Sequence, residues 1–167
     1  MAGTPVIVVN DCATEIGYLY GGGNAADVNG STITFNAGTV HYDAFGGGHG
    51  DKNASNPSKY ADVKGNVTFN VYGGTIGRVF AGSNSRGEIT GTSSLTINKT
   101  GTCAMKIGEV YGGGNEAAGK ASSVNIGCTG TLVSPLTEPA AFKRSRAVEV
   151  PKIDGTRMRC IAELTRS

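Results

Sequence analysis

A short motif recurs along this chain roughly every 30 residues, and it limits the possible fold more than any other feature. Each copy has an aliphatic residue, an aromatic residue a few positions later, and then a glycine-rich run that ends in Asn or His. The four copies are residues 16–24, 40–49, 76–84 and 107–115, and their aromatic residues are Tyr20, Phe45, Phe80 and Tyr111. A fixed period of this size is the signature of a repeat architecture.

A second motif lies between these copies and alternates apolar with polar residues. Residues 6–10, 32–36, 66–70, 94–98 and 123–127 align without gaps. A period of two is typical of a strand with one buried face. The alignment predicts two inward columns: Ile7, Ile33, Val67, Leu95 and Val124, then Val9, Phe35, Phe69, Ile97 and Ile126. The polar column between them contains Val8, Thr34, Thr68, Thr96 and Asn125.

A Gly-Thr pair follows four of the five alternating segments and predicts a corner that leads into the second strand. The pairs begin at Gly38, Gly74, Gly101 and Gly130. Together the motifs predict an all-β fold, a right-handed parallel β-helix (a β-solenoid) of about five rungs. Right-handed winding is expected because β-crossover-β connections strongly favour it, and a propeller blade would need four strands in about 40 residues.

The repeats end before the last part of the chain, which predicts two regions. Residues 1–134 are expected to form the β-solenoid domain. Residues 135–167 are expected to be an irregular basic extension, either a capping hairpin or a disordered remnant. Seven Lys/Arg and four Asp/Glu give residues 138–167 a charge of +3, so the preceding residues sum to −1 of the total +2.

A nearly neutral repeat body lacks the basic stripe of a nucleic-acid groove, so no nucleic-acid partner is expected. No apolar run approaches the length of a transmembrane helix, and no membrane insertion is expected. None of the glycine runs has the Gly-Lys-Ser/Thr ending of a phosphate-binding loop, and no cofactor is expected. The glycines are therefore interpreted as corners of the fold.

The four cysteines, Cys12, Cys103, Cys128 and Cys160, include no CxxC pair that would indicate a zinc knuckle. Isolated cysteines in apolar columns usually behave as small hydrophobic residues. We therefore expect the four cysteines to be free thiols that pack as small apolar residues, with disulfide bonds as the alternative.

Candidate binding residues lie on outward positions of the predicted strands. Three of them, Tyr18, Arg78 and Glu109, each follow an Ile-Gly pair and could line a glycan groove. A polar ladder of Thr34, Thr68 and Thr96 is the second candidate surface. His41, His49 and Asp51 are weak candidates for a metal site, but variation between repeats also explains them, and no metal is predicted.

The Tyr-Gly-Gly-Gly-Asn turns at residues 20–24 and 111–115 resemble repeats of large secreted or surface-attached bacterial proteins. These are right-handed parallel β-helices of the pectate-lyase-like or adhesin-like type, and the resemblance covers about residues 5–133. It implies an extracellular or cell-surface location and a role as a stalk, adhesin or sugar binder. A cytoplasmic location is the alternative, because the first residues do not resemble a signal peptide.

The expected function is a non-enzymatic structural or adhesive module of a larger protein. Its partners would be a polysaccharide, a host or cell-surface protein, or further copies of the chain bound end to end. The alternative is a carbohydrate-active β-helix enzyme, a polysaccharide lyase or glycoside hydrolase, with its site around Arg78 and Glu109.

Overall fold

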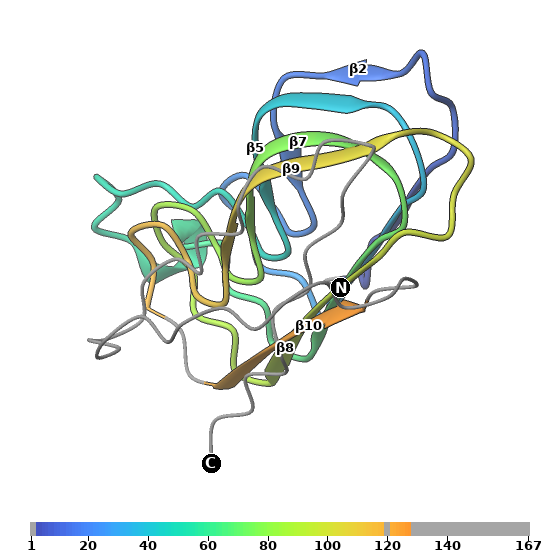
Figure 1. The fold of residues 1–167 in the computed structure, drawn as a ribbon. Helices are drawn as coiled ribbons and strands as arrows, with labels where there is room; N and C mark the ends of the chain where they lie inside the picture. Colours follow the sequence, from blue (N-terminus) through green and yellow to red (C-terminus); the bar gives the residue numbers. More distant parts are fainter. Residues whose placement is uncertain (1–2, 119–120, 128–167) are drawn as a thin grey trace, which may run out of the picture.

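The computed structural model describes residues 3–118 and 121–127, which form an all-β structure (Figure 1). Its strands are β1 (Val6–Val9), β2 (Glu15–Ile16), β3 (Leu19–Tyr20), β4 (Ser31–Phe35), β5 (Thr39–Phe45), β6 (Val67–Val71), β7 (Gly74–Phe80), β8 (Thr92–Asn98), β9 (Met105–Tyr111) and β10 (Ala121–Gly127). A 3-10 helix, η1 (Pro57–Lys59), lies in the longest loop. Within these residues no helix is long and apolar enough to cross a membrane. The predicted 135–167 extension and the Gly130 corner lie outside the described residues.

The strands form two parallel sheets. Sheet A has the order β1-β4-β6-β8-β10, and sheet B has the order β2-β5-β7-β9, with β3 also paired to β5. Successive long strands alternate between the sheets, which lie on opposite sides of the molecule in Figure 1. Each repeat therefore contributes one strand to sheet A and, in the first four repeats, one strand or strand pair to sheet B. We number the repeats one to five from β1, β4, β6, β8 and β10.

The core lies between the sheets and is built from the predicted inward columns, with one correction. The pairings of Ile7 with Ile33 and of Leu95 with Val124 are as predicted. In repeat three, however, Phe69 pairs with Ile33 and Leu95, so the expected alignment of Val67 with them is wrong. The strand is shifted by two residues, which leaves every side chain on its expected face because the period of a strand is two.

Sheet B confirms the predicted aromatic column. Tyr20 pairs with Phe45, Phe45 with Phe80, and Phe80 with Tyr111. Their rings are stacked, with centroid separations of 5.2, 4.7 and 4.4 Å in that order. These spacings lie close to the ~4.8 Å between neighbouring strands, so the rings follow the strand spacing.

The Gly-Thr corner is confirmed in two repeats and is wrong in the fourth. Gly38 and Gly74 have φ values of +93° and +83°, a backbone conformation that favours glycine. The residue opposite Gly74 is Met105, so Gly101 is not its equivalent. Residues 99–104 instead form a longer loop, in which the Gly101 N–H donates to the Tyr72 carbonyl at 2.9 Å.

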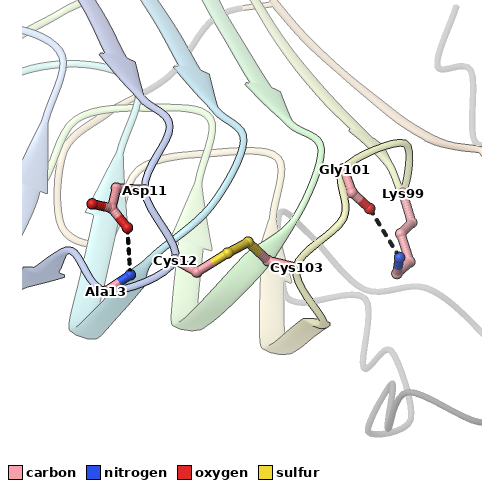
Figure 2. The surroundings of a disulfide bond; sticks show 6 residues. All are labelled: Asp11, Cys12, Ala13, Lys99, Gly101 and Cys103. Carbon is pink, nitrogen blue, oxygen red and sulfur yellow. Dashed lines mark hydrogen bonds between the residues drawn. A yellow bond between two sulfur atoms is a disulfide. The ribbon is translucent and has the colours of Figure 1, made fainter.

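This longer loop carries one half of a disulfide. Cys103 is bonded to Cys12, which lies in the loop between β1 and β2 (Figure 2). The expectation of free thiols is therefore wrong for Cys12 and Cys103. Repeats two and three turn tightly at residues 36–38 and 72–73, so the two longer loops meet across them. Cys128 and Cys160 lie outside the described residues.

Candidate functional site

A groove of about 760 Å³ opens on the glycine turns that follow the sheet B strands. Repeats one to four all contribute to it. The lining residues are Tyr18, Tyr20, Gly22, Asn24, Asp43, His49, Asn84, Ser85, Asn115 and Glu116. We refer to this surface as the turn groove.

Close stacking of the turns forms one wall of the turn groove. The Asn84 N–H donates to the Gly48 carbonyl at 2.9 Å, and the Asn115 N–H donates to the Ser83 carbonyl at 3.1 Å. A Cβ added to Gly82 would lie 2.5 Å from the Gly114 nitrogen, so the turns can approach this closely only without a side chain there. The polar residues that end the turns are thereby brought side by side.

Three of the four residues that end these turns carry a side-chain amide, and the fourth is a histidine. They are Asn24, His49, Asn84 and Asn115, and we call the four the amide row. Nδ2 of Asn115 donates to Oδ1 of Asn84 at 3.1 Å, and Nδ2 of Asn84 donates to the Tyr20 hydroxyl at 3.4 Å. Asn84 and Asn115 each use one of their two N–H donors in these bonds, and the second N–H of each can donate to a ligand.

Tyrosines form the adjoining wall. Tyr18 and Tyr20 line this wall, and Tyr42 lies outside the groove lining but stacks on Tyr18 at 4.8 Å between ring centroids. Tyr18 and Tyr42 are 52% and 58% exposed. His49 packs edge-on against Tyr20 at 5.2 Å. Partial burial raises the pKa of Tyr20, so its hydroxyl keeps its proton at neutral pH and remains a donor as well as an acceptor.

The charged residues at the groove are held in pairs. Both carboxylate oxygens of Asp43 accept hydrogen bonds from Arg78, at 2.7 and 2.8 Å. This contact raises the pKa of Arg78, which stays charged. Oε2 of Glu109 accepts a hydrogen bond from the Tyr111 hydroxyl, which raises the pKa of Tyr111. Glu116 lies 3.4 Å from Nζ of Lys52. Within the part of the chain that the structure describes, no Lys or Arg lines the turn groove itself.

The structure places the three glycan candidates near the turn groove, but only one of them lines it. Tyr18 lines the turn groove, whereas Arg78 and Glu109 lie beside it as paired residues of β7 and β9. The register of β5 and β7 opposes Asp43 to Arg78, with an irregularity between Val40 and Asp43. Sequence alignment did not place Asp43 opposite Arg78. The asparagines of the amide row were interpreted only as corner residues, and His49 was a weak metal candidate. The regular recurrence of Asn and His after the glycines was the available signal.

The three threonines lie in sheet A, and the sequence prediction that they form one column is wrong. Thr34 and Thr96 pair with Asn70, whereas Thr68 pairs with Thr32 and Ser94. The two-residue shift of β6 therefore distributes polar side chains over two adjacent columns. Both columns belong to a different sheet from the turn groove.

The weak metal candidates have separate contacts. His41 Nε2 lies 2.7 Å from Glu15 Oε2 on the surface, and His49 lines the turn groove. The Asp51 side chain accepts a hydrogen bond from the Asn53 N–H. Among residues 3–118 and 121–127 no group of three or more His, Cys, Asp or Glu residues could hold a metal ion.

No family model matches this chain, and no curated protein or solved structure matches it either. The functional argument therefore rests on the geometry of the turn groove.

Proposed function

We propose that this protein is a right-handed parallel β-helix module of an extracellular or cell-surface protein, and that it binds a glycan without cleaving it. The alternation of successive strands between two parallel sheets supports the β-helix. The Cys12–Cys103 disulfide supports the location, because such bonds persist mainly in oxidising compartments. The resemblance of the Tyr-Gly-Gly-Gly-Asn turns to bacterial surface repeats agrees with both.

The β-helix predicts that whole repeats can be removed. Val67 pairs with Ser93, so deleting residues 68–93 joins equivalent positions and keeps the alternation of the strand. Deleting residues 68–94 removes one residue more and turns the following side chains to the wrong face. We expect the first variant to fold and the second to lose its cooperative melting transition by circular dichroism. Equal behaviour of the two deletions would contradict the β-helix.

The observation that carries glycan binding is the combination of the exposed Tyr18 ring in the turn groove, on which Tyr42 stacks, with the amide row. Tyrosine rings offer an apolar surface to the C–H groups of a sugar and a hydroxyl to its polar groups. Amide side chains can donate to one sugar hydroxyl and accept from its neighbour. A concave site with a few convergent polar groups is the usual form of a small-ligand site.

Binding without cleavage is favoured because the carboxylates near the turn groove are already engaged. Glycoside hydrolases need one carboxyl group as an acid and a second as a base or nucleophile. Here Asp43 is held by Arg78, Glu109 by Tyr111 and Glu116 by Lys52. Arg78, the one cation among the three glycan candidates, is already held by Asp43.

We expect Tyr18→Ala and Tyr42→Ala each to weaken glycan binding by about fivefold to tenfold, the effect of losing one aromatic contact. A panel of neutral and acidic polysaccharides, measured by calorimetry, identifies the ligand. Tyr60→Ala is the matched control, because the Tyr60 ring packs against Arg86 and has no ring contact with Tyr18 or with the lining of the turn groove. Binding that survives both Tyr18→Ala and Tyr42→Ala unchanged would place the ligand elsewhere.

The same polysaccharide panel separates binding from catalysis. We expect no new reducing or unsaturated ends after long incubation with the protein. Bond cleavage that disappears in Glu109→Gln would instead establish the carbohydrate-active enzyme, and the proposal of a non-enzymatic module would be wrong.

A further inference from the structure

The core residues that remain partly exposed mark the two ends of the strand stack. Ile7 in β1 and Ile16 in β2 are only half-buried, as are Val124 and Ile126 in β10. Their equivalents in the intervening strands are fully covered: Ile33, Phe35 and Leu95 are 0% exposed. Among residues 3–118 and 121–127, the same apolar columns are therefore covered inside the stack and only partly covered at its ends.

The free edge of β1 exposes backbone groups as well. The Pro5 carbonyl accepts from the Thr32 N–H, and the Val9 carbonyl accepts from the Asn36 N–H. Because alternate residues of a parallel strand face opposite neighbours, the N–H and C=O groups of Val6 and Val8 point away from β4. No other strand among the described residues pairs there. The strand carries none of the charges, prolines or bulges that normally protect an edge.

The strand at the other end of sheet A has the matching pattern. β10 pairs with β8 so that Val124 lies opposite Leu95 and Ile126 opposite Ile97. β1 pairs with β4 in the same alternation, Ile7 opposite Ile33 and Val9 opposite Phe35. Neither β1 nor β10 contains a charged residue. A β10 placed before a β1 would therefore repeat the contact that already joins neighbouring strands in the sheet.

We propose that β10 of one copy of this chain pairs in parallel with β1 of a second copy. Val124 then lies opposite Ile7 and Ile126 opposite Val9, which covers the half-buried residues of both ends. The contact joins two different surfaces, so it does not close on itself and adds copies head to tail. It is independent of the turn groove, because it uses the ends of sheet A.

The assembly is tested with the full 167-residue chain. We expect its mass in light scattering to increase with concentration without stopping at a dimer. Val8→Pro removes an N–H that faces the free edge and makes no bond to β4, and this variant is expected not to extend. Added in small proportion to the unmodified protein, it should cap growing assemblies and shorten them. Val8→Thr keeps the N–H and should assemble like the unmodified chain.

Three outcomes would overturn the head-to-tail contact. The first is a strict monomer at millimolar concentration. The second is a dimer that never grows, which would indicate symmetric pairing of two β1 edges. The third is growth that Val8→Pro neither stops nor caps. Circular dichroism checks that Val8→Pro is folded; if it is not, Val6→Lys places a charge at the same edge and is expected to stop growth in its place.

Discussion

Phe69→Asp is expected to abolish folding. The Phe69 side chain is 0% exposed and lies between Ile33 and Leu95 in the middle of sheet A. Loss of a buried aromatic ring alone costs about 3–5 kcal/mol, and an unpaired buried carboxylate adds several more. That sum is comparable to the whole free energy of unfolding of an ordinary domain, about 5–15 kcal/mol. Circular dichroism should show no cooperative melting transition.

Thr68→Asp is the matched control for this substitution. Thr68 is the preceding residue of β6 and points to the outer face, where its neighbours Thr32 and Ser94 are uncharged. We expect its free energy of unfolding to change by no more than about 1 kcal/mol. If both variants melt like the unmodified protein, the assignment of Phe69 to the core between the sheets is incorrect.

The aromatic column could be predicted because several signals coincide at each of its positions. Each aromatic residue of the column precedes a glycine-rich run of small residues, and aligning these runs between repeats also aligns the aromatic residues. They are Tyr20, Phe45, Phe80 and Tyr111. Large rings also stack only when they lie at the same level of neighbouring strands, so sequence and register agree. The all-β class followed from the same repeats.

The register of repeat three could not be predicted because its strand offers two equivalent alignments. The sequence from Val67 to Val71 alternates over its whole length, so a shift by two residues keeps Phe69 inside and Thr68 outside. The contact beside the turn groove was missed for a related reason. The irregularity in β5 between Val40 and Asp43 shifts the pairing of the two strands, so Asp43 lies opposite Arg78.

The disulfide depends on loop geometry that spacing does not reveal. Cys12 and Cys103 are 91 residues apart in sequence, but their Cα atoms lie 6.1 Å apart. The two cysteines meet because residues 99–104 pack against the corners of repeats two and three. This packing is close at Gly101, where an added Cβ would lie 2.9 Å from the Asn36 carbonyl oxygen. The sequence alignment had assigned these same residues to an ordinary Gly-Thr corner.

Removal of the disulfide is expected to cause the second large loss of stability. Closing a loop of this length lowers the entropy of the unfolded chain, which corresponds to about 4–5 kcal/mol of stability. The Cys12→Ser/Cys103→Ser variant should therefore fold but melt roughly 15 °C lower than the oxidised protein. A thermal melt followed by circular dichroism measures the difference. Added reductant should lower the melting temperature of the unmodified protein similarly and leave the variant unchanged.

Cys128→Ser/Cys160→Ser is the matched control, because it keeps the bridging pair and removes the two remaining cysteines. Its melting temperature should fall on reduction by about the same amount as that of the unmodified protein. A bridge of this span should also slow the separation of repeats one to four from one another, since Cys12 and Cys103 lie in the first and fourth repeats. If the oxidised and reduced forms melt together, the bond adds nothing to folding, and the argument it provides for an oxidising location also fails.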